Sequence, residues 1–190
     1  MDDAPFALSP DLFVLRQAGI RLLLPAASAH CGSTAPASKS WLASEPWATF
    51  LTKIPTAPSM VWTYRELGED LAGRGNPARG ALWRDIIRDL QLPRGFVAFW
   101  PHSLLEGNEY ILKCDVFVEG LSRIGPKTLV VFDASPVEGA ASAMLGHVRA
   151  ALPWLHILTI PMPSSVTGDA TQLAREIASS VRLFLQTITG

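Results

Sequence analysis

Acidic side chains and a histidine follow two apolar runs of this chain. Glu66, Glu69 and Asp70 come soon after the run SMVWTY, and His102 comes directly after GFVAFWP. A carboxylate at such a place can act as a general base, and an imidazole can exchange a proton or stabilise a charge. We therefore take Glu66 and Asp70 as candidate catalytic bases and His102 as their candidate electrostatic partner.

The stretch around these acids, YRELGEDLAGRGNPARG, is rich in glycine and leads into a helical pattern. Glycine amides ahead of a helix N-terminus can hold an anion, so we expect ligand contacts from Gly68, Gly73, Arg74 and Asn76. The stretch matches neither GxxxxGK[ST] nor GxGxxG, and its acids would repel a phosphate. An ordinary solvated connection between a strand and a helix is the alternative interpretation.

Two serines complete the predicted ligand contacts: Ser103, next to His102, and Ser164, in the segment PMPSS. A serine adjacent to a histidine in sequence does not normally present its hydroxyl to that ring, so we predict no catalytic triad. The histidines and carboxylates show no metal-ligand spacing, and two cysteines are too few for an iron–sulfur cluster. We therefore expect no metal, no metal cluster and no other cofactor.

Strands and helices alternate along the chain and must position these residues. Short apolar, β-branched or aromatic runs predict strands at 59–64, 95–101, 127–133 and 155–163. Helical periodicity and helix-start signals predict helices at 76–92, 108–125, 135–153 and 168–188. This alternation predicts a three-layer α/β/α sandwich with a central, mainly parallel, four-stranded sheet. Open sheets of this kind bind ligands outside the carboxyl ends of their strands.

The first third of the chain has a different pattern. Residues 1–58 are predicted to form an N-terminal arm and an irregular helical segment that pack on the α/β domain, 59–190, as one globular unit. Trp41 and Trp47 in this region are candidates for a partner surface. The apolar run near the start is interrupted by Arg16 and Arg21 and follows an acidic MDDAP, which argues against a signal peptide or a membrane span. We expect a cytoplasmic protein.

The composition narrows the functional classes. Of the 190 residues, 48% are apolar and 17% charged, which is typical of a buried sheet and not of a disordered chain. A net charge of −1 and a pI near 6.4 give no general attraction to nucleic acid or anionic lipid. Binding to DNA would therefore need a local basic patch.

Four pieces covering roughly the last two-thirds of the chain resemble the uracil-DNA glycosylase superfamily, especially its short bacterial branches. They are VWTYRELGEDLAGRGNPARGALWRDII, FVAFWPHS, GPKTLVVFDASP and LHILTIPMPSSV. The resemblance implies the fold of a DNA repair enzyme with a water-activating Asp or Asn, or another acidic residue, close behind the first strand, where Glu66, Glu69 and Asp70 are the nearest candidates. It also implies a final-loop histidine that stabilises the departing uracil anion, but Met162 stands at that place. Methionine cannot donate a hydrogen bond to an anion, so one expected catalytic contribution is missing.

Two functions follow from this resemblance. The first is a divergent, non-catalytic binding or assembly module linked to DNA metabolism, which contacts DNA or a protein partner through its N-terminal arm. The psi subunit of the bacterial replicative clamp loader is a precedent, since it looks like a reduced relative of this fold whose helical arm binds partners. The alternative is an active DNA glycosylase or other hydrolase that uses Glu66 or Asp70 together with His102.

Overall fold

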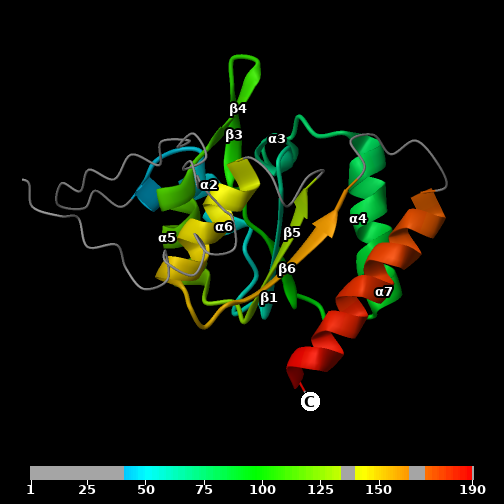
Figure 1. Ribbon diagram of the computed structural model, residues 1–190. Helices are drawn as coiled ribbons and strands as arrows, with labels where there is room; N and C mark the ends of the chain where they lie inside the picture. Colours follow the sequence, from blue (N-terminus) through cyan, green and yellow to red (C-terminus); the bar gives the residue numbers. More distant parts are fainter. Residues whose placement is uncertain (1–40, 134–139, 163–169, 190) are drawn as a thin grey trace, which may run out of the picture. The chain divides into compact units, whose positions relative to one another are not determined.

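A parallel sheet forms the centre of the computed structural model, which describes residues 41–133, 140–162 and 170–189. Its strands are β1 (Met60–Tyr64), β2 (Val97–Phe99), β5 (Thr128–Asp133) and β6 (His156–Pro161), in the order β2-β1-β5-β6 (Figure 1). In the register, Trp62 of β1 lies beside Phe99 of β2 and Val130 of β5. The predicted α/β/α sandwich with a four-stranded parallel sheet is confirmed.

The two inner strands are buried on both faces, which explains their continuous apolar sequences. Successive side chains of a strand point to opposite faces, so Val61 and Met60 of β1 enter different cores. One core lies against α2 (Trp47–Thr52), α5 (Cys114–Ile124) and α6 (Ala140–Ala151). The other lies against α4 (Pro77–Leu90) and α7 (Ala170–Thr189), and Figure 1 shows these two helices on the opposite side of the sheet from α5 and α6.

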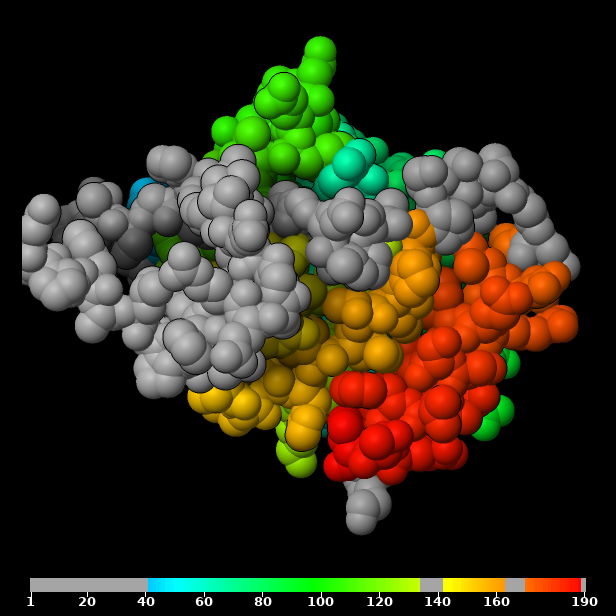
Figure 2. Space-filling view, in the orientation of Figure 1, coloured from blue at the N-terminus to red at the C-terminus, as the bar shows by residue number. Residues whose placement is uncertain are grey.

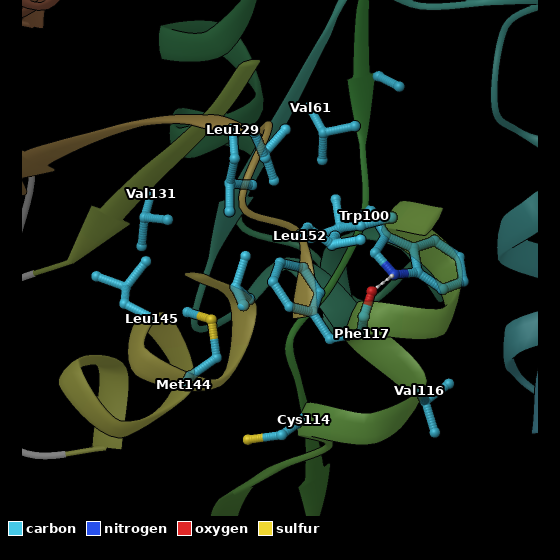
Figure 3. Packing of buried hydrophobic residues seen from close by; sticks show 14 of the residues in the cluster. Val61, Trp100, Cys114, Val116, Phe117, Leu129, Val131, Met144, Leu145 and Leu152 are labelled. Atoms are coloured by element: carbon cyan, nitrogen blue, oxygen red, sulfur yellow. Dashed lines mark hydrogen bonds between the residues drawn. The ribbon is translucent and has the colours of Figure 1, made fainter. Parts of the chain in front are cut away.

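The core on the α5 and α6 side includes a contact that requires glycine. A Cβ atom on Gly120 would lie only 2.2 Å from Trp100 Cε2, so the helix backbone rests directly on the indole ring. Trp100 Nε1 donates a hydrogen bond of 3.2 Å to the carbonyl oxygen of Phe117 one turn earlier (Figure 3). This contact fixes α5 against the end of β2.

Two short segments differ from the sequence-based expectation. The helix predicted at 108–125 is wrong in its first part, because Ser103–Glu106 (β3) and Glu109–Leu112 (β4) form an antiparallel hairpin and α5 begins only at Cys114. Gly107 has a φ of 64° at the turn, a conformation that permits the tight reversal. A five-residue helix, α3 (Leu67–Leu71), occupies part of the stretch expected to be a plain connection.

The described part of the N-terminal third packs into the core. A 3-10 helix, η1 (Trp41–Ala43), precedes α2, and both contribute to the core on the α5 side. Trp47 is only 4% exposed, so its predicted place on a partner surface is wrong, whereas Trp41 is 61% exposed. Among the described helices, none has the length and hydrophobicity needed to cross a membrane.

Candidate functional site

The predicted site lies where the strands end at the carboxyl edge of the sheet. The connection after β1 carries α3 and leads to α4, and the connection after β2 carries the β3–β4 hairpin, which projects at the top of Figure 1 beside α3. The ends of β5 and β6 are joined by a hydrogen bond of 2.9 Å from the Met162 amide to the Asp133 carbonyl. Ser164 lies outside the described residues.

Asp70 is held by two side chains. Arg79 donates to both of its carboxylate oxygens, at 2.7 Å from Nε and 2.5 Å from Nη2, and the Tyr64 hydroxyl donates at 2.6 Å. The Asp70 and Arg79 side chains are only 16% and 18% exposed. Hydrogen bonding to Asp70 raises the pKa of Arg79, and burial followed by the hydrogen bond to Asp70 raises the pKa of Tyr64. Asp70 is thus the centre of a two-sided clamp between the end of β1 and the start of α4.

Aromatic packing supports this clamp. The Tyr64 ring stacks on Trp83 of α4 with 4.9 Å between centroids, and the Arg79 guanidinium lies 5.6 Å from the centre of the Tyr64 ring. Trp83 also packs against Phe132 at the end of β5, at 4.7 Å. The side chains that hold Asp70 are therefore fixed in place by the core beneath them.

Glu69 contacts the hairpin, and Glu66 precedes α3 beside Arg65. The Tyr110 hydroxyl of β4 donates to Glu69, and the Arg65 guanidinium lies 4.9 Å from the centre of the Tyr110 ring. Burial, followed by the hydrogen bond to Glu69, raises the pKa of Tyr110 to about 12. The Glu66 carboxylate is 3.6 Å from Arg65, and its side chain is 33% exposed. Of the predicted bases, Glu66 is therefore the one that solvent reaches most readily.

His102 lies at the base of the hairpin and is 3% exposed. Its Nδ1 is 2.8 Å from the Thr63 hydroxyl of β1, and its ring meets the Phe117 ring edge-on at 5.9 Å. Burial lowers the pKa of His102 to about 4, because a charged ring would lose its hydration without gaining an ion partner. The histidine is consequently neutral at physiological pH, and its main-chain carbonyl accepts a 2.8 Å hydrogen bond from Lys113.

The residues predicted to bind a ligand have mixed surroundings. Gly68 is covered, since a Cβ atom there would lie 2.8 Å from the Ser103 carbonyl, and the Ser103 hydroxyl donates to the Arg65 carbonyl at 2.7 Å. The Asn76 side chain accepts from the Ala78 amide at 2.9 Å and so caps α4. Gly73 and Arg74 are exposed. Gly68, Ser103 and Asn76 thus have structural partners, and Gly73 and Arg74 face solvent.

The sheet separates the two kinds of predicted catalytic residue. Asp70 is bound to Tyr64 and His102 to Thr63, and these neighbours in β1 point to opposite faces of the sheet. Asp70 therefore belongs to the α4 side and His102 to the α5 side. Among the described residues, no group of three or more histidine, cysteine, aspartate or glutamate side chains could hold a metal ion.

Sequence reasoning missed the partners that fix these residues. The sequence pattern predicts only that Tyr64 ends a strand and that Tyr110 belongs to a helix. A tyrosine at the carboxyl end of a buried strand, followed by acids within one or two helical turns, was the available signal for the Tyr64–Asp70 contact. Nothing in the residue spacing indicated the contact between Tyr110 and Glu69, because these two residues belong to the connections after different strands.

No protein-family model matches the chain, and no curated protein matches its sequence significantly.

Proposed function

We propose that this protein is a divergent uracil-DNA glycosylase-like protein that acts as a non-catalytic binding or assembly module linked to DNA metabolism. The observation that carries the proposal is the position of Asp70 and His102, two of the three residues predicted to be catalytic. Both are occupied by structural contacts, and they are bound to opposite faces of the sheet. Neither can reach a common substrate atom without loss of the contacts that hold it.

The electrostatics of His102 support a non-catalytic function. Anion stabilisation needs a donor or a charge that faces the developing negative atom. The His102 ring is neutral and 3% exposed, and its Nδ1 is engaged by Thr63, so it brings no positive charge to a developing anion. Met162, at the place of the family's final-loop histidine, is half-buried and packs against the core beside α4 and α7. Its thioether accepts weak hydrogen bonds but donates none.

The electrostatics of Asp70 lead to the same conclusion. A general base needs an oxygen that is free to accept a proton from water. Here Arg79 binds both oxygens and Tyr64 binds one of them a second time. A water that took the place of Arg79 would displace a charge-assisted hydrogen bond, which is stronger than a neutral one, and Oδ1 keeps only one further acceptor position.

The exposure of Glu66 favours the alternative function, a glycosidic-bond hydrolase. Its carboxylate is partly exposed, with the side chain 33% exposed, and Arg65 is its ion partner among the described residues. Under this alternative Glu66 activates water without help from His102. Such an enzyme would be weak, because a positioned base alone contributes about 10²–10⁴-fold in rate.

An excision assay separates the two functions. The purified full chain is incubated with uracil-containing single-stranded and double-stranded oligonucleotides, with an active uracil-DNA glycosylase as positive control. We expect no release of uracil above the level of a heat-denatured sample. Release that is abolished by Glu66→Gln, but retained in Glu109→Gln on the exposed hairpin turn, would establish the hydrolase and refute the binding module.

The partner is part of the proposal. We assign partner contact, with DNA or with a protein, to the N-terminal arm within residues 1–58. Trp41, which belongs to this range and is 61% exposed, supports a contact surface there. At the described carboxyl edge Arg79 is paired with Asp70 and Lys113 with Glu106, so these two cations add little attraction for DNA.

A further inference from the structure

The outer edge of β6 carries backbone groups that the described residues leave unpaired. β6 is the last strand in the sheet order, and within the described part of the chain it pairs only with β5. The His156 amide donates to Lys127 at 3.1 Å and the Met162 amide donates to Asp133 at 2.9 Å, so even-numbered residues face β5. Because backbone groups alternate along a strand, the amides and carbonyls of Ile157 and Thr159 face outward.

Between His156 and Pro161, this edge lacks the charges and prolines that usually prevent strand pairing. Charged side chains, prolines and very short length protect natural edge strands. The segment from Ile157 to Ile160 has no charged residue and no proline, whereas β2 at the other edge is only three residues long and is followed closely by Pro101. In Figure 2 the amber atoms of β6 lie at the surface beside the red and orange atoms of α7.

One exposed aromatic side chain precedes this strand. Trp154 stands two residues before β6 and is 51% exposed. Tryptophan is enriched at protein interfaces, so its place next to an unpaired strand fits a contact with another chain.

We propose that β6 pairs antiparallel with β6 of a second copy of this chain, about a two-fold axis at Leu158. This axis places Ile157 opposite Thr159 of the second copy, and Thr159 opposite its Ile157. Each outward amide then meets an outward carbonyl, and Pro161, which has no amide hydrogen, falls outside the paired residues. The two four-stranded sheets become one continuous sheet.

A second copy suits this edge better than a charged partner. A two-fold interface brings each patch against itself, so charges on the patch would repel. The strand segment 157–160 is uncharged, and the exposed Trp154 shortly before it is apolar. The dimer is closed, since both β6 edges are used and the short β2 strands form the remaining edges. This inference does not depend on the proposed function.

Sedimentation of the full chain tests the dimer. Between about 1 and 100 µM we expect the mass to rise from 20.5 kDa toward twice that value, since association follows mass action. Amide hydrogen exchange at Ile157 and Thr159 should slow in parallel, while Leu158 and Ile160 stay protected throughout. A monomer over the whole range overturns the proposal. So does full protection of Ile157 and Thr159 in the monomer, which would mean that the chain's own residues cover this edge.

Variants at Thr159 locate the interface. Thr159→Pro removes an outward amide that no bond inside the described sheet uses, and we expect it to weaken dimerisation about tenfold or more. Thr159→Val keeps the amide and the branched shape and should dimerise like the wild type. If Thr159→Pro does not fold by circular dichroism, Thr159→Lys places a charge on the edge and should have the same effect. Unchanged dimerisation in a folded edge variant would place the interface elsewhere and refute the proposal.

Discussion

Asp70 and His102 are bound to consecutive residues of β1 on opposite faces of the sheet. Asp70 accepts from the Tyr64 hydroxyl at 2.6 Å, and His102 lies 2.8 Å from the Thr63 hydroxyl. The alternation of side chains along a strand is enough to separate them, although both follow strands that end at the same edge. The sequence therefore suggested that Asp70 and His102 act together, but the alternation of side chains along β1 holds them on opposite faces of the sheet.

We expect the Asp70–Arg79 pair to stabilise the fold. Asp70→Asn removes the charge from a largely buried, doubly bonded pair and should lower the free energy of unfolding by about 1–3 kcal/mol. A double-mutant cycle with Arg79→Gln, followed by urea denaturation, should give a coupling energy of about 1 kcal/mol or more.

The exposed ion pair on α4 is the matched control for that cycle. Arg88 and Asp85 are also 2.5 Å apart, but their side chains are 78% and 43% exposed. Asp85→Asn should cost no more than about 0.5 kcal/mol, because solvent screens exposed pairs. Equal losses at Asp70 and Asp85 would show that the Asp70 clamp contributes nothing beyond a surface contact.

Burial of His102 should make the fold sensitive to acid. Its pKa falls from 6.5 in the unfolded chain to about 4 in the folded protein, so below pH 6.5 protons bind preferentially to the unfolded chain. The contribution of His102 to the free energy of unfolding is fully present above pH 6.5. As the pH falls from 6.5 toward 4, this group lowers the free energy of unfolding by about 3 kcal/mol in total. Urea denaturation at stepped pH values measures this slope.

His102→Gln removes the titrating group but keeps a polar side chain that can bond Thr63. Its stability should fall less steeply than that of the wild type between pH 6.5 and 4, whatever its stability at pH 7.5. Parallel slopes for the two proteins in that window would show that other groups cause the acid sensitivity.

The hairpin should depend on Tyr110. Tyr110→Phe keeps the ring beside Arg65 but removes the hydroxyl that donates to Glu69. We expect the hairpin to lose about 1 kcal/mol of stability. Amide exchange in 104–111 should then be faster than in the wild type, while exchange in the core strands stays the same. Glu69→Gln keeps an acceptor for the hydroxyl and should have a smaller effect. Unchanged exchange in Tyr110→Phe would mean that the Ser103–Arg65 contact alone holds the hairpin.

Much of the sheet was predictable because its inner strands are continuous apolar runs with β-branched and aromatic residues. The hairpin was missed because EYIL before a helix fits the start of that helix as well as a short strand. The turn residues Gly107 and Asn108, between runs that can form strands, were the available hairpin signal. The burial of His102 was not predictable, because it depends on how β1 and α5 pack around this side chain.

The close approach at Gly120 gives the sharpest test of the packing. A methyl group there would overlap the Trp100 indole, so Gly120→Ala must shift α5 or the ring, and we expect a loss of about 1–3 kcal/mol or more. Gly146→Ala is the matched control, since it lies within α6 with no atom within 4 Å of the added Cβ. Alanine is the better helix former by about 0.5–1 kcal/mol, so this variant should gain stability. Thermal denaturation of both proteins measures the contrast. A gain in both would mean that the Trp100 ring moves aside at little cost, and would remove the contact that fixes α5 against the end of β2.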